Sequence, residues 1–99
     1  MNTIRARLHR KGDEWMLAAC DDELAGKTFS EGEVKFTLSE NYYGTESMSE
    51  ETLAERMGSV SVMNLFGERT IAVGIEKGYV DPKNVIIVAG IKHAQVVYL

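Results

Sequence analysis

The chain has 99 residues, of which 44% are hydrophobic and 26% are charged, and its formal net charge is −4. This composition is typical of one globular domain, and it excludes a disordered chain and a collagen-like repeat. Cys20 is the only cysteine, which excludes an intrachain disulfide and favours a reducing compartment. The longest apolar run, residues 85–89, is too short to span a bilayer, and no apolar segment of a signal peptide follows the basic residues 1–11. We therefore expect one cytoplasmic domain over residues 1–99, without a membrane partner.

Charge is segregated along the sequence. Twelve of the 15 acidic residues lie between residues 12 and 55, where the only basic residues are Lys27 and Lys35. This acidic middle segment argues against binding of nucleic acid by the whole protein, because affinity for a duplex depends mainly on neutralisation of phosphates by Lys and Arg. It is compatible with cation binding, and also with a solvated acidic surface that only keeps the protein soluble.

The first part of the chain has the period-two pattern of β-strands. Residues 4–9 alternate apolar and basic side chains, as in a half-buried strand. A turn at 11–13 leads to a second apolar strand over 14–20, so the two segments predict an antiparallel hairpin. After one helical turn at 21–27, which Asp21 would cap, residues 34–39 alternate again and predict a third strand.

Two helices are expected next. The first is capped by Ser47 or Ser49 and ends near Met57. The second covers about 61–77, where apolar side chains occupy more than one helical face, as in a buried helix. Residues 85–89 and 92–99 then predict two final strands. The order β-β-β-α-α-β-β predicts an α+β fold, with a mostly antiparallel sheet of about five strands and two helices packed on one face.

The densest acidic cluster suggests a divalent-cation site. Calcium takes several oxygen ligands and tolerates the irregular geometry of flexible loops. An EF-hand is excluded, because Ala25 and Gly32 would stand at the fifth and twelfth loop positions, where ligands belong. A weaker site of another kind stays open, beside the alternative that Asp21 and Glu23 only cap a helical turn. The candidate ligands are Asp21, Asp22, Glu23 and Glu31.

No catalytic motif is present in the sequence. His9, His93 and Cys20 have none of the spacings of a zinc site or of a nucleophile paired with a base. The glycines do not form a phosphate-binding loop, and no Ser stands in a nucleophile elbow. We therefore expect a protein that is not an enzyme and has no obligatory cofactor, with calcium as a candidate ligand.

A basic strand face is the alternative binding surface. If the apolar residues of the first strand face the helices, Arg5 and Arg7 face the opposite side of the sheet, and Lys35 joins them from the third strand. With His93, these side chains predict a surface for single-stranded RNA or a ribosomal component. The other interpretation is a solvated face on which arginines pair with carboxylates of neighbouring strands.

Six segments, in this order along the chain, resemble one known family. They are His9-Arg10-Lys11-Gly12-Asp13-Glu14, Ala19-Cys20-Asp21, Gly26-Lys27-Thr28, Phe66-Gly67-Glu68-Arg69, Val80-Asp81-Pro82 and His93-Ala94-Gln95-Val96-Val97. The family is a group of archaeal proteins of about a hundred residues, catalogued as a domain of unknown function, and the resemblance covers essentially the whole chain. It implies a cytoplasmic protein with a small α+β fold and no established enzyme activity.

The sequence thus supports two hypotheses of different kinds. The first is a non-enzymatic binding protein whose acidic segment coordinates a divalent cation, with calcium favoured over magnesium. The second is an RNA- or translation-associated module that uses the basic strand face.

Overall fold

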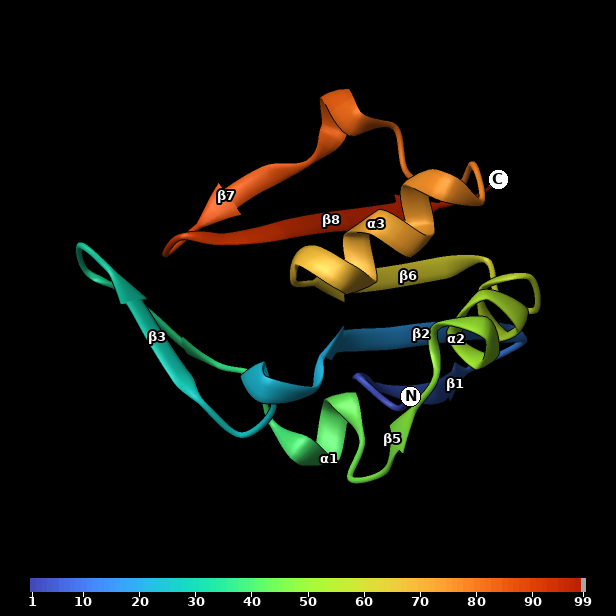
Figure 1. Ribbon diagram of the computed structural model, residues 1–99, viewed down its shortest axis with the longest axis horizontal. Coiled ribbons are helices and arrows are strands. Elements are labelled where there is room, and N and C mark those ends of the chain that lie inside the picture. The colour runs from blue at the N-terminus through green and yellow to red at the C-terminus, as the bar shows by residue number, and fades with distance from the viewer. Residues whose placement is uncertain (99) are drawn as a thin grey trace.

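The computed structural model describes residues 1–98, and its centre is a mixed sheet of six strands in the order β5-β1-β2-β6-β8-β7 (Figure 1). All neighbours pair antiparallel except β2 and β6, which run parallel. A separate hairpin, β3-β4, forms a second sheet. The strands are β1 (Ile4–Lys11), β2 (Glu14–Asp21), β3 (Thr28–Glu31), β4 (Val34–Thr37), β5 (Ser47–Met48), β6 (Val62–Phe66), β7 (Ile86–Val88) and β8 (Ile91–Val97). The helices are α1 (Glu40–Tyr43), α2 (Glu50–Met57) and α3 (Glu68–Glu76), with 3-10 turns at Asp22–Leu24 and Pro82–Asn84.

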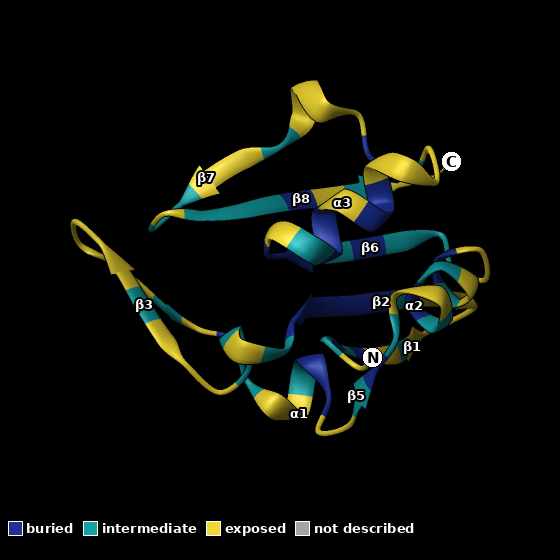
Figure 2. Cartoon of the chain, in the orientation of Figure 1, coloured by how far each residue is buried: buried dark blue, intermediate teal, exposed yellow. Residues whose placement is uncertain are grey.

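Helices α2 and α3 cover one face of the main sheet, which confirms the expected α+β class (Figure 1). Leu53 of α2 and Ile71 of α3 pack with strand side chains such as Leu17 and Leu65 in the main hydrophobic core. Figure 2 shows β2 as buried over its second half, from Leu17 to Asp21. This is expected for a strand that has a neighbouring strand on each side and side chains packed on both faces. The expected hairpin of the first two strands is also confirmed, from Ile4↔Asp21 to Lys11↔Glu14.

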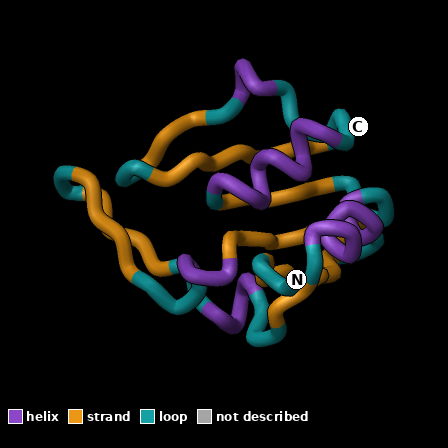
Figure 3. Tube along the Cα trace, in the orientation of Figure 1, coloured by secondary structure: helices purple, strands orange, loops and turns teal. Residues whose placement is uncertain are grey.

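The expectation of one helix over 61–77 is wrong in its first part. Residues Val62–Phe66 form β6, and α3 begins only at Glu68 (Figure 3). Both faces of β6 meet other side chains, since Met63 and Leu65 pack in the main core and Phe66 packs with Tyr43 on the opposite face, so its apolar residues do not alternate clearly. Gly67, at φ 109°, separates the strand from the helix with a conformation that side-chain-bearing residues rarely adopt.

The third expected strand does not join the main sheet. Residues 34–37 pair with β3 in the separate hairpin, where Phe36 pairs with Phe29. The short helix α1 follows it, capped by Ser39. The expected strand over 92–99 is β8, Ile91–Val97, and its last expected residue, Leu99, lies outside the described residues.

The second face of the sheet is covered in part, where the sequence suggested an open basic face. Tyr43 of α1 and Leu38 pack there against Ala18, Cys20 and Phe66 in a second hydrophobic cluster. The hairpin β3-β4 contributes half-buried aromatic side chains to this cluster. None of the helices in the described part of the chain has the length and apolar character needed to cross a membrane.

Candidate functional site

Asp21 is a structural cap. Its side chain is buried at 3% exposure, and its Oδ1 accepts hydrogen bonds from the backbone N and the Oγ1 of Thr70, both at 2.8 Å. Its Oδ2 accepts a third hydrogen bond, from the backbone N of Arg69 at 3.1 Å. These donors belong to the first turn of α3, whose N-cap residue, Gly67, has no side chain to offer. Asp21 therefore caps a distant helix, and it makes no side-chain cap bond to the local 3-10 turn that the sequence suggested.

The two acidic residues that follow are each engaged by an arginine. Asp22 Oδ1 accepts hydrogen bonds from Arg5 Nε at 2.6 Å and from Ser47 Oγ at 2.7 Å. The hydrogen bond from Ser47, followed by that from Arg5, lowers the pKa of Asp22. Glu23 pairs with Arg69, and a backbone hydrogen bond, followed by this arginine, lowers the pKa of Glu23.

The fourth candidate ligand lies elsewhere. Glu31, at the end of β3, accepts a hydrogen bond from the backbone N of Ala89 at 3.2 Å, which ties the hairpin β3-β4 to the turn between β7 and β8. Within residues 1–98, no three His, Cys, Asp or Glu side chains are close enough to share a metal ion. The structure thus does not bring the four carboxylates into one ligand group.

The basic residues of the alternative surface are also separated. Arg5 also donates to Glu40 at 3.3 Å and Arg7 donates to the carbonyl of Asn41 at 3.0 Å, so α1 occupies both guanidinium groups. His93 is stacked on Phe66, with ring centroids 4.0 Å apart. Lys35 is exposed on β4, in the separate hairpin.

Cys20 is an unsuitable nucleophile. It is fully buried in the cluster beneath α1, and this burial raises the pKa of its thiol to about 12. The neighbouring Asp21 charge acts in the same direction. Because the thiolate is the reactive form, this site supports no thiol chemistry near neutral pH.

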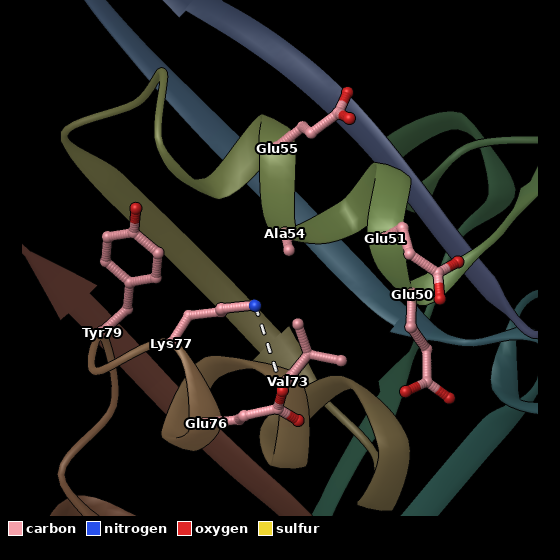
Figure 4. Close-up of a pocket in the computed structure, with 8 residues that line it drawn as sticks. All are labelled: Glu50, Glu51, Ala54, Glu55, Val73, Glu76, Lys77 and Tyr79. Carbon is pink, nitrogen blue, oxygen red and sulfur yellow. Dashed lines mark ion pairs between the residues drawn. The ribbon is translucent and has the colours of Figure 1, made fainter.

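The groove between α2 and α3 is lined by four glutamates (Figure 4). It is open to solvent and has a volume of about 500 Å³. Ser49 caps α2 by accepting a hydrogen bond from the N of Thr52 at 3.1 Å, which places the next residues, Glu50 and Glu51, in the first helical turn. The residues that line the groove are Glu50, Glu51, Ala54, Glu55, Val73, Glu76, Lys77 and Tyr79.

Charge in this groove, which we call the acidic groove, is poorly compensated. Among the described residues, Glu50, Glu51 and Glu55 form no ion pair, and Glu76 has only its neighbour Lys77, at 3.9 Å. Glu51 and Glu55 are one helical turn apart, an arrangement of like charges that costs about 0.2–0.5 kcal/mol in an isolated helix. A positive partner would relieve this repulsion.

The sequence patterns did not predict the acidic groove. Acidic residues are favoured in the first turn of a helix by the helix dipole. Glu50 and Glu51 therefore indicate the start of a helix and not part of a binding site. The signal that was present is the spacing of Glu51 and Glu55, four residues apart, which puts these two carboxylates on the same side of the helix. The opposing wall, Val73, Glu76 and Lys77, lies within the helix expected over 61–77, but local patterns do not show that the two helices pack side by side.

The sequence matches the family model described as "Protein of unknown function (DUF424)" over residues 9–99. The chain belongs to this family. The membership confirms the resemblance of the six segments and adds no activity. No curated protein sequence matches the chain.

A solved structure has the same fold. It is described as "Crystal structure of an uncharacterized conserved protein from Methanopyrus kandleri", and this organism is an archaeon. The TM-score is 0.84 at 21% sequence identity, and the match covers 97% of this chain and 93% of the other. At this identity the likeness supports the fold of this DUF424 chain and leaves its function to be argued from the site.

Proposed function

We propose that this protein is a non-enzymatic binding protein that holds a basic segment of a partner protein in the acidic groove. One observation carries the proposal: Glu50, Glu51 and Glu55 line an open groove of about 500 Å³ and have no ion-pair partner among the described residues. Opposite charges across an interface increase the association rate and select the partner.

The lining of the groove suits lysine and arginine side chains. Half-buried Ala54 and the small exposed part of Val73 provide the apolar part of the lining. Long basic side chains lay their methylene groups on such a surface and keep the charged head near oxygen atoms. The Tyr79 ring stands at one end of the groove and offers a face to a cation (Figure 4).

The divalent-cation site expected at Asp21, Asp22, Glu23 and Glu31 stays a prediction. Calcium takes six to eight oxygen ligands, whereas all four of these carboxylates accept hydrogen bonds from the protein, and Glu31 lies apart from the others on the hairpin. The RNA- or ribosome-associated alternative and the cytoplasmic location also stay predictions. Titrations with calcium and with single-stranded RNA test these two predictions in the same experiment.

The test is a titration of the labelled protein with a lysine-rich peptide, followed through backbone amide NMR. We expect saturable shifts at the groove residues, and binding that weakens as salt increases. The triple variant Glu50→Gln, Glu51→Gln, Glu55→Gln should bind the peptide about tenfold more weakly.

A matched control removes the same charge elsewhere. Asp13→Asn, Glu14→Gln, Glu33→Gln changes three exposed acidic residues outside the groove. If this control weakens binding as much as the groove variant, only net charge is at work and the proposed site is wrong. Saturable calcium shifts at Asp21–Glu31 would support the cation prediction instead, and salt-sensitive RNA binding lost in Arg5→Ala, Arg7→Ala would support the RNA alternative.

A further inference from the structure

The sheet has an incomplete edge along the second half of β8. β7 pairs with β8 only from Ile86↔His93 to Val88↔Ile91. Before Ile86 the chain runs through the 3-10 turn Pro82–Asn84, which arches away from β8 (Figure 1). No strand of the described chain therefore continues β7 beside the residues that follow His93.

Two residues of β8 direct backbone groups toward this empty edge. On the other side, Lys92 O accepts from Gly67 N and Tyr98 N donates to Ser61 O, both at 2.8 Å, so the even-numbered residues bond toward β6. Hydrogen bonding alternates along an antiparallel strand, which turns the N–H and C=O of Gln95 and Val97 to the side of β7. Within residues 1–98, neither has a backbone partner on that side.

A second groove, of about 400 Å³, lies along this edge. One wall is the end of β8 from Ala94 together with Tyr98, and the other lies in the segment from Gly78 to Asn84. Natural sheets protect a free edge with charged side chains or proline, but Ala94–Tyr98 contains neither. Val97 and Tyr98 are 58% and 46% exposed.

The second groove borders the acidic groove, and Tyr79 lines both. It also carries one negative charge, that of Asp81, which forms no ion pair within the described residues. A chain bound in the acidic groove could thus extend past Tyr79 and meet Asp81 beside β8.

We propose that the basic partner segment continues from the acidic groove along β8 and adds a short strand to it, hydrogen-bonded to Gln95 and Val97. The occupant is an extended peptide with lysine or arginine in one half and alternating apolar and polar residues in the other. A basic residue near the junction faces Asp81. This inference rests on the proposed function, because the acidic groove supplies the charge that selects the partner.

The test uses two synthetic peptides that differ only in their backbone. Both have a lysine-rich half and a half of alternating valine and threonine, and in the second peptide alternate residues of the valine–threonine half are N-methylated. N-methylation removes hydrogen-bond donors without changing charge. We expect the first peptide to slow hydrogen exchange at the amides of Gln95 and Val97, and the methylated peptide to bind about tenfold more weakly and give no such protection.

The outcomes separate the two proposals. If both peptides shift the acidic groove equally and neither protects Gln95 and Val97, strand addition is wrong and the proposed function stands. If neither peptide binds, both proposals fail. Val97→Pro gives a second check, because proline is tolerated where the N–H of an edge strand faces outward. Val97→Pro should bind the two peptides with equal affinity, whereas Val97→Thr should still bind the unmethylated peptide more tightly.

Discussion

Asp21 on β2 and Thr70 on α3 are joined by two hydrogen bonds of 2.8 Å, one from the backbone N and one from the hydroxyl of Thr70. Both residues are buried, at 3% and 0% exposure. The contact fastens the sheet to the helix that forms one wall of the acidic groove. It therefore links the N-terminal hairpin, through packing, to the proposed binding site.

Removing this cap should be strongly destabilising. Asp21→Ala leaves the N–H groups of Arg69 and Thr70 without their acceptor in a buried place, and we expect a loss of about 3 kcal/mol in the free energy of unfolding. Urea denaturation measures it. Asp13→Ala, on the exposed turn between β1 and β2, should change little. A loss below about 1 kcal/mol for Asp21→Ala would show that the cap is unimportant.

A substitution at Gly67 tests the contact between Asp21 and the start of α3 in a second way. Its φ of 109° is unfavourable for any residue with a side chain, and a Cβ there would overlap the Asp21 carboxylate. We expect Gly67→Ala to cost more than about 2 kcal/mol, or to prevent folding. Gly12→Ala is the matched control: it also has positive φ, at 62°, but its Cβ would meet nothing within 4 Å. The difference between the melting temperatures of the two variants measures the destabilisation caused by the steric overlap with Asp21.

Acid should weaken the fold partly through Asp22. Because hydrogen bonds from Ser47 and Arg5 lower the pKa of Asp22 in the folded state, its contribution to stability is present above the unfolded pKa and is lost as pH falls through the folded one. We expect Asp22→Asn to be less stable than the wild type at neutral pH and to lose less stability on acidification. Parallel loss in the two proteins below pH about 4 would contradict this assignment.

Cys20 should be inert until the protein unfolds. Burial raises the pKa of its thiol to about 12, so the thiolate is scarce at neutral pH and the sulfur is enclosed. Alkylation of the native protein should be much slower than that of free cysteine. In urea the rate should approach the free value. Reaction of the native protein at the free-cysteine rate would revive a catalytic interpretation of this thiol.

The turn between β7 and β8 offers a stabilising substitution. Ala89 has φ 51° and Gly90 has φ 79°, the geometry of a two-residue turn that favours asparagine or glycine first. Ala89→Asn should raise the free energy of unfolding by about 0.5–1 kcal/mol, measured by urea denaturation. Ala89→Val should lower it, because a β-branched side chain is poorly tolerated at positive φ. No difference between the two variants would contradict this description of the turn.

Local patterns predicted the hairpin of β1 and β2, because its alternation and its turn are short-range features. They also placed Arg5 and Arg7 on the same face. The alternation could not reveal that α1 covers part of this face, since that contact joins segments more than thirty residues apart in the sequence. The same limit explains Asp21: its neighbours suggested a local cap, and its true partner is Thr70.

Residues 62–66 show the opposite difficulty. A strand buried on both faces has no polar side to mark its period, so its sequence fits a buried helix equally well. The α3 wall of the acidic groove lies in the part of this prediction that is correct, but the sequence could not show that α3 packs beside α2. The other wall, on α2, was placed correctly by its cap, since capping chemistry is local.

The parallel pairing of β2 with β6 has a consequence for how the chain folds. Met16 pairs with Val62, and everything between them must be looped out before this ladder can close. Such distant pairing slows folding, because chain entropy is lost before the contacts form. We infer that the first two strands assemble early and that the β6-α3-β8 unit docks onto them late. A chain cut in the turn after α2 would then yield two fragments that are unstable alone and recover the native sheet when mixed.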